Sequence, residues 1–265
     1  MPYSLIDIGA NLMHSSFDED RAEMMRRAAD ASVDKIIVTG SSDDSNVQAA
    51  ELAEKLPGVL FSTAGVHPHH ASHYSDDSDA LIRSLILKDA VVAVGECGLD
   101  YYRNLSPREA QLEALQRQLE IARDSGLPVF LHQRDAHDDF VEMLQPLLPD
   151  ISNAVAHCFT GDAEALHEYL ELGLYVGITG WICDERRGKH LQDIVSAIPD
   201  DKLLIETDAP YLMPRTLDPK PKTRRNEPAY LTEVLRVVAV ARGQSEEHVA
   251  HITTMNALHF FALPP

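Results

Sequence analysis

The sequence predicts an α/β protein with the architecture of a (β/α)8, or TIM, barrel. Eight short apolar runs recur along the chain, and each is followed by a longer segment with helical spacing. Several runs are almost continuously apolar, which is typical of parallel strands covered on both faces. Eight such units in 265 residues fit a barrel of this type, whose usual length is about 250 residues. A doubly wound open sheet is the alternative, and hydrophobic periodicity alone does not separate the two.

The predicted strands are bounded by the apolar runs themselves. In chain order they are Leu5–Ile8, Lys35–Thr39, Leu60–Val66, Val91–Gly95, Pro128–Leu131, Ala154–Ala156, Leu174–Ile178 and Leu203–Thr207. Pro107–Asp124 is the clearest predicted helix, because its apolar residues recur on one stripe. Gly126 and Gly173 each stand just after a predicted helix and before a strand, where glycine commonly ends a helix.

A single domain is predicted for residues 1–265. The sequence shows no repeat, low-complexity tract or linker that would divide the chain. Its one interruption rich in proline and charge, Pro214–Pro228, follows the eighth predicted strand. We interpret it as a long loop over one end of the barrel. The last helices, from about Tyr230 to Phe261, are expected to close the barrel.

Composition narrows the class of protein. The 23 Lys and Arg residues oppose 42 Asp and Glu residues, giving a net charge of −19. This balance excludes nucleic-acid binding through a general positive field and leaves bound cations and local arginines as the means of contact. Three cysteines and no signal-like start favour a reducing cytoplasm. No apolar run approaches the roughly 20 residues that cross a bilayer, so no membrane contact is expected. No protein partner is indicated, and a monomer is expected.

Polar side chains follow the apolar runs of five predicted strands. These strand ends read Gly65-Val66-His67-Pro68-His69-His70, Gly95-Glu96-Cys97-Gly98-Leu99-Asp100, Leu131-His132, His157-Cys158-Phe159-Thr160-Gly161 and Ile205-Glu206-Thr207-Asp208-Ala209-Pro210-Tyr211. In a barrel the carboxyl ends of all strands surround one mouth, so residues distant in the sequence converge there.

Four of these residues together predict a divalent-metal site. Glu96, His132, His157 and Asp208 supply two imidazoles and two carboxylates from the ends of four strands. A single His or Glu after a strand is usually a hydrogen-bonded loop residue, but four at equivalent positions favour metal binding. His67 is the best further functional candidate. Cys97 and Cys158 adjoin predicted ligands, so strand alternation predicts that they point away from the mouth as buried thiols.

These motifs resemble those of the TatD-type metal-dependent nucleases, a family of amidohydrolase-like barrels, and the resemblance covers essentially the whole chain. It rests on Gly65–Pro68, Gly95–Asp100, His132 with Arg134-Asp135-Ala136, His157–Gly161, Glu206–Tyr211 and Arg224–Pro228. The resemblance implies a phosphodiester hydrolase that depends on Mg²⁺ or a similar ion, with Asp208 activating the water. It also implies a 3′→5′ exonuclease that prefers single-stranded DNA, acts on RNA too, and serves in DNA degradation or repair.

The first predicted strand departs from the family pattern. Most relatives carry Asp-x-His-x-His there, whereas this chain reads Asp7-Ile8-Gly9-Ala10-Asn11. Gly9 has no side chain, and Asn11 offers only a neutral amide oxygen. One firm metal site is therefore predicted, with a second ion recruited by substrate phosphate. The roles of Asp7, His69 and His70 stay open.

A bound cation helps phosphodiester hydrolysis because it lowers the pKa of water and screens the phosphate. Mg²⁺ prefers oxygen ligands, while two imidazoles also suit Mn²⁺ or Zn²⁺, so the ligands leave the metal's identity open. Asp208 is predicted to accept the proton of the water, and His67 to orient phosphate or protonate the leaving oxygen. The predicted contacts to substrate phosphate are Arg134, Arg224, Arg225 and Asn11.

Two other functions compete with a nuclease. The same kind of barrel hydrolyses esters and amides, and relatives of this type include enzymes that remove D-amino acids from mischarged tRNA. A non-catalytic scaffold is the third hypothesis, because the first-strand histidines are absent. The presence of Glu96, His132, His157 and Asp208 together argues against a scaffold, since a decayed site has no reason to keep all four.

Overall fold

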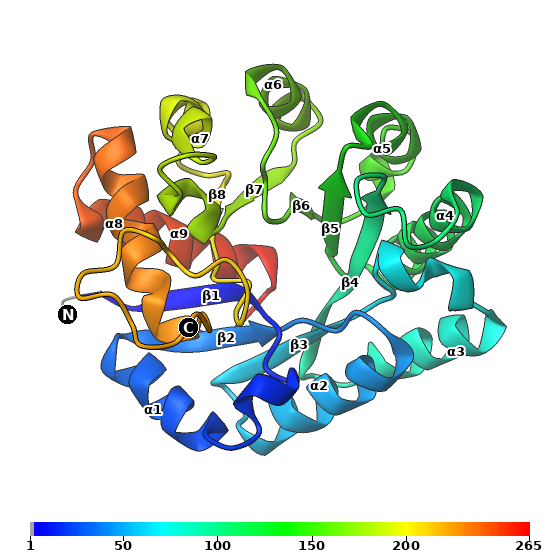
Figure 1. Ribbon diagram of the computed structural model, residues 1–265. Coiled ribbons are helices and arrows are strands. Elements are labelled where there is room, and N and C mark those ends of the chain that lie inside the picture. Colours follow the sequence, from blue (N-terminus) through cyan, green and yellow to red (C-terminus); the bar gives the residue numbers. More distant parts are fainter. Residues whose placement is uncertain (1–2) are drawn as a thin grey trace.

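The structure, a computed structural model, describes residues 3–265 and is a (β/α)8 barrel. Eight parallel strands pair in sequence order from β1 to β8, and a parallel bridge between Ala10 and Ala209 joins the end of β1 to the segment after β8. Figure 1 shows the helices arranged outside this ring of strands. The predicted fold class is therefore confirmed, and the ring arrangement removes the open-sheet alternative.

The elements alternate along the chain as the apolar runs predict. The strands are β1 (Leu5–Ala10), β2 (Val33–Val38), β3 (Leu60–Ala64), β4 (Val91–Asp100), β5 (Val129–Arg134), β6 (Ala154–Ala156), β7 (Tyr175–Ile178) and β8 (Leu203–Ile205). The helices are α1 (Arg21–Asp30), α2 (Asp43–Lys55), α3 (Asp76–Leu85), α4 (Arg108–Ser125), α5 (His137–Leu144), α6 (Ala163–Glu171), α7 (Lys189–Ile194), α8 (Leu231–Arg242) and α9 (Glu246–Phe260). No helix in the described residues is both long enough and apolar enough to span a membrane.

Strands β4 and β5 run further than the sequence predicts. Their pairing continues past the first polar residues, with Gly98 opposite His132 and Asp100 opposite Arg134. Pairing of this kind needs only backbone groups, so polar side chains do not end it. Gly98 has a φ of 146°, and a Cβ there would overlap the carbonyl oxygen of His132. Glycine at this position therefore allows the close approach of two strands that carry predicted ligands.

The interior of the barrel is filled from the starts of the strands. Side chains such as Ile6 of β1, Phe130 of β5 and Leu204 of β8 form one buried cluster. Phe260 and Phe261, at the end of α9, belong to the same cluster. Helix α9 lies behind β1 and β8 in the view of Figure 1. One end of the barrel is thus packed with apolar side chains, and the polar side chains gather beyond it at the carboxyl ends.

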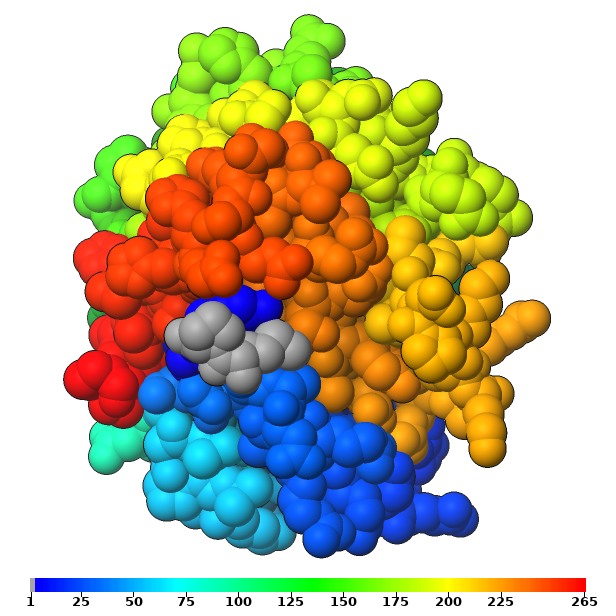
Figure 2. Space-filling model, turned by 90° about the vertical axis from the view of Figure 1, so that its left-hand side faces the viewer, coloured from blue at the N-terminus to red at the C-terminus, as the bar shows by residue number. Residues whose placement is uncertain are grey.

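The segment Pro214–Pro228 is a loop without helix or strand up to the short 3-10 helix η6 (Pro228–Tyr230), as the sequence predicts. In Figure 2 its gold and orange residues lie at one edge of the molecule, beside the yellow-green segment that follows β7. Arg215 of this loop pairs with Glu185 of that segment at 2.7 Å. An ion pair therefore links the loop after β7 to the loop after β8.

Candidate metal centre

Three imidazoles surround one buried carboxylate oxygen at the mouth of the barrel. Glu96 Oε1 lies 3.3 Å from His67 Nε2, 3.2 Å from His132 Nδ1 and 2.7 Å from His157 Nε2. Glu96 and His132 lie in β4 and β5, while His67 and His157 follow β3 and β6. The strand ends that the sequence singles out therefore converge, because neighbouring parallel strands end at the same rim.

The residues present fit a divalent metal ion. His67, Glu96 and His132 each offer a ligand atom, and these atoms lie within 4.8 Å of one another; no other group of three or more in residues 3–265 does so. His132 Nε2 is buried and has no hydrogen-bond partner. Buried polar atoms are rarely left without a partner, so this nitrogen indicates a missing ligand at the site. Imidazole and carboxylate together suit Mg²⁺, Mn²⁺ or Zn²⁺.

Hydrogen bonds to the far ring nitrogens distinguish His67 from His157. His67 Nδ1 accepts the backbone N–H of His69 at 3.0 Å, so a neutral His67 carries its proton on Nε2, facing the site. His157 Nδ1 instead lies 3.3 Å from a carboxylate oxygen of Glu206, which places the lone pair of a neutral ring on Nε2. A ligating imidazole needs that lone pair toward the metal. This geometry favours His157 as a ligand and His67 as a donor to substrate, although ligand-atom spacing alone selects His67.

Glu206 orients the ring of His157 through its Nδ1, the nitrogen that faces away from Glu96. The sequence did not predict this role. Its side chain is fully buried, and its second oxygen accepts the backbone N–H of Cys158 at 2.6 Å. A Cβ at Gly9 or at Gly177 would lie 2.5 or 2.7 Å from the two carboxylate oxygens. The missing side chain on β1 therefore leaves the room that Glu206 occupies. The sequence could have pointed to Glu206, because it stands directly before Thr207-Asp208 at the end of a predicted strand.

Asp208 lines the same pocket and is held by β1. Its Oδ1 accepts the side-chain N–H of Asn11 at 2.9 Å, and its backbone N–H donates to the carbonyl of Gly9 at 2.8 Å. Burial raises the pKa of Asp208 to about 7, opposed by His157 and assisted by the charges of Glu96 and Glu206. Asn11, predicted to contact phosphate, thus also positions the predicted base.

The histidines and Glu96 determine each other's charge. Burial works to raise the pKa of Glu96, but His67 and His157 hold it well below its usual range. Burial lowers the pKa of His67 to about 4, so this ring is neutral at neutral pH. For His157, burial lowers the pKa but Glu96 and Glu206 raise it well above its usual value. Glu96 is therefore a carboxylate, the form that binds a cation.

Asp100 and His69 extend the site beyond the predicted ligands. Asp100 Oδ2 lies 2.7 Å from His69 Nε2 and 3.4 Å from His132 Nε2. Burial works to raise the pKa of Asp100, but the nearby imidazoles of His132 and His69 and the backbone N–H of Arg103 hold it below its usual range. Both residues stood in the strand-end motifs, yet only the pairing of β4 with β5 brings Asp100 beside His132.

The pocket over these residues has a volume of about 420 Å³, and its rim includes Arg103, Leu105, Arg134, Cys158 and Tyr211. The sequence expectation of a buried Cys158 pointing away from the mouth is wrong, because Cys158 lines this pocket and is only partly buried. Strand β6 ends at Ala156, and Cys158 has a φ of 47°, so strand alternation does not reach it. Cys97 is fully buried within β4, as expected.

The structure separates the four predicted phosphate contacts. Arg134 and Asn11 line the metal pocket. Arg225 lies elsewhere, where two nitrogens donate to the carboxylate of Asp20 at 2.7 Å each and one pairs with Glu227. Arg224 is exposed and does not line the pocket. The structure therefore does not bring Arg224 and Arg225 to the metal centre; for Arg225 the reason is its pairing beside α1.

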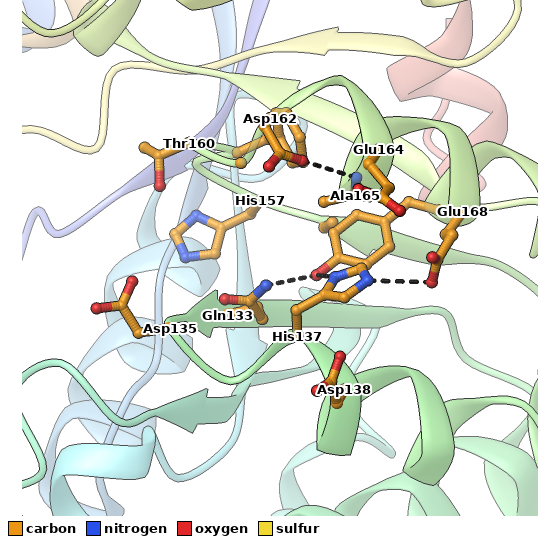
Figure 3. Close-up of a pocket in the computed structure, with 14 residues that line it drawn as sticks. Gln133, Asp135, His137, Asp138, His157, Thr160, Asp162, Glu164, Ala165 and Glu168 are labelled. Atoms are coloured by element: carbon orange, nitrogen blue, oxygen red, sulfur yellow. Dashed lines mark hydrogen bonds and ion pairs between the residues drawn. The ribbon is translucent and has the colours of Figure 1, made fainter.

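A second pocket of about 410 Å³ adjoins the first and shares His157 with it. Figure 3 shows His157 at one side of this space and hydrogen bonds between His137 and Glu168 and between Gln133 and the Tyr169 hydroxyl. The acidic residues around it are Asp135, Asp138, Asp162, Glu164 and Glu168. The side of the mouth beyond His157 is therefore negatively charged.

Comparison with known proteins places the chain in a family. The family model described as TatD related DNase matches residues 6–262. A 3′-5′ ssDNA/RNA exonuclease TatD from Rahnella sp. (strain Y9602) is 49% identical over 259 residues, covering 98% of both chains, and one from Erwinia billingiae is 48% identical, covering 98% of this chain and all of the relative. The crystal structure of a TatD homologue from Escherichia coli K12 superposes with a TM-score of 0.89 at 29% identity, covering 98% of each chain. The chain belongs to the TatD related DNase family.

Proposed function

We propose that this protein is a metal-dependent nuclease that hydrolyses phosphodiester bonds of single-stranded DNA and RNA from the 3′ end. The observation that carries the proposal is the convergence of three imidazoles on Glu96, with Asp208 in the same pocket. Family membership supports the reaction, and the names of the relatives support the substrate and the polarity.

In this proposal Glu96, His132, His157 and Asp208 hold one firm divalent ion, taken to be Mg²⁺, with Mn²⁺ and Zn²⁺ as alternatives. When bound, the ion lowers the pKa of water and screens the charge of the phosphate. Strand β1 carries no imidazole for a second ion: Gly9 has no side chain, and Asn11, just after the strand, donates to Asp208. A second ion would therefore depend on substrate phosphate.

The chain's own residues handle the proton and the phosphate. Asp208 accepts the proton of the attacking water; because Asn11 holds Oδ1, we assign the proton to Oδ2. His67 presents the N–H of Nε2 to a phosphate oxygen, since its Nδ1 is occupied by the backbone of His69. Glu206 keeps the ring of His157 in one orientation throughout. For Asp208 and His67, the hydrogen bond on the far side of the group thus determines which atom faces the substrate.

The test is cleavage of a 5′-labelled single-stranded oligonucleotide and of the same strand in a duplex, with and without EDTA. We expect the single strand to shorten from its 3′ end and to be cut faster than the duplex, because a chain of net charge −19 lacks an extended basic surface for duplex backbone. EDTA should stop cleavage. Preference for duplex, or cleavage that EDTA does not affect, would contradict the proposal. D-aminoacyl-tRNA in a parallel assay tests the ester-hydrolase hypothesis, and inactivity on every substrate would favour the scaffold.

A further inference from the structure

Two arginines at the metal pocket have no carboxylate partner. Most arginines of the described residues form ion pairs, and those without one are Arg103, Arg134, Arg187 and Arg224. Arg103 and Arg134 both line the pocket that holds Glu96 and His132. In a chain with 42 acidic residues, an arginine without a partner beside a metal centre is available to an external anion.

The two arginines lie on one continuous surface. Arg134 ends β5, and its guanidinium stacks on the ring of Tyr102, with 3.8 Å between the guanidinium carbon and the ring centroid. Arg103 follows β4; its backbone N–H donates to Asp100 at 2.8 Å, and its side chain is exposed. Because β4 and β5 pair as far as Asp100 and Arg134, both positive charges stand at the same rim.

The same surface exposes apolar groups that suit unpaired bases. Tyr102 is 60% exposed and Leu105 is 66% exposed, so both side chains are accessible to a ligand beside the two arginines. Leu105 also lines the metal pocket. Stacking of bases on exposed aromatic side chains, next to cationic groups that contact the backbone, is how proteins bind single strands without reading sequence. We call Tyr102, Arg103, Leu105 and Arg134 the β4–β5 rim.

The neighbouring part of the mouth, over the ends of β5 and β6, is unfavourable for a polyanion. Beyond His157 lies the acidic pocket, where Asp138 and Glu164 are both exposed. Phosphates placed there would meet like charges in a partly enclosed space, whereas at the β4–β5 rim they meet guanidinium groups. The charges therefore give the mouth a positive side and a negative side.

We propose that the β4–β5 rim is the strand-binding surface of this enzyme, with Arg103 and Arg134 contacting phosphates next to the scissile one, Tyr102 stacking on an unpaired base and Leu105 packing against a base. This inference rests on the proposed nuclease function. On this inference the bound strand runs from the metal centre over the ends of β4 and β5, and it does not run over the acidic loops after β5 and β6.

The test compares a short oligothymidylate with methyl p-nitrophenyl phosphate, a diester that has no neighbouring phosphates. Arg103→Ala and Arg134→Ala should each raise KM for the oligothymidylate about tenfold, the effect of losing one charge-assisted hydrogen bond, and leave hydrolysis of the small diester unchanged. Each should also lower the salt dependence of log KM by about 0.7, the contribution of one phosphate contact on a single strand. Arg134→Lys should lose less, because the charge stays.

Arg187→Ala is the matched control, because Arg187 also lacks an ion pair and lies over an aromatic ring, Trp181, but does not line the metal pocket. Its KM should match the wild type. Asp138→Asn combined with Glu164→Gln should leave KM for the oligothymidylate unchanged or lower it. An increase of KM in that double variant would place the strand on the acidic side and overturn the inference.

The remaining outcomes separate this inference from the proposed function. Unchanged KM in both arginine variants, with normal wild-type cleavage, would overturn the β4–β5 rim and leave the nuclease intact. Equal losses on the oligothymidylate and the small diester would also overturn it, since the arginines would then act at the scissile phosphate. A wild-type protein that cleaves neither substrate with Mg²⁺, Mn²⁺ or Zn²⁺ would overturn the proposed function itself.

Discussion

Replacement of His132 with alanine is expected to abolish nuclease activity and to reduce bound metal while the fold stays intact. His132 is the residue whose buried Nε2 lacks a partner and whose Nδ1 faces Glu96 at 3.2 Å. Metal catalysis of this kind supplies several kcal/mol, so loss of the ion should reduce turnover by about 10³-fold or more. The measurements are oligonucleotide turnover, metal content after dialysis, and circular dichroism.

His137→Ala is the control for that experiment. His137 is also partly buried and bonded to a carboxylate, Glu168, at 3.0 Å, but it lies in the neighbouring acidic pocket. We expect this variant to keep its activity and its metal. Full activity of His132→Ala, with the same metal content as the control, would show that the metal assignment is wrong.

The second large effect separates the two carboxylates. Asp208→Asn keeps the size of the side chain and one coordinating oxygen but removes the base, and loss of a positioned base reduces rates by about 10²–10⁴-fold. Glu96→Gln removes the charge at the point where three imidazoles meet, so we expect it to weaken metal affinity first. High metal concentration should therefore restore much of the rate of Glu96→Gln and little of the rate of Asp208→Asn.

Turnover of both variants across a metal titration, with DNA affinity measured alongside, tests that difference. Asp208→Asn should bind DNA and metal appreciably at saturating metal and remain slow. If excess metal restores Asp208→Asn as fully as it restores Glu96→Gln, then Asp208 is only a ligand and another group takes the proton.

The fold and the centre of the site were predictable because both follow from local patterns. The apolar runs located the eight strands, and Glu96, His132 and His157 stood at the ends of three of them. In a barrel the carboxyl ends of all strands surround one mouth, so the convergence of these residues follows from the fold. The predicted family and its class of activity, a DNase, are confirmed by the family model that matches residues 6–262 and by a relative 49% identical over 259 residues.

The sequence was less informative wherever a role depends on contacts between strands. Glu206 matters because Gly9 and Gly177 leave room for it, and neither glycine signals that space on its own. The sequence predicted Arg225 as a phosphate contact, but in the structure it donates to both carboxylate oxygens of Asp20, which is 205 residues away in the sequence. Arg134 has no ion pair and Arg225 has two, and this difference depends on which carboxylates the fold brings near each arginine.

The location of a bound ion is the sharpest test of the metal assignment. Anomalous diffraction from crystals soaked in Mn²⁺, recorded at the manganese edge, shows where the metal lies without relying on activity. We expect one strong peak at the mouth of the barrel, within bonding distance of Glu96, His132 and His157 and adjacent to Asp208. A peak confined to the acidic pocket around Glu164 and Glu168, or no peak at Glu96 at saturating metal, would contradict it.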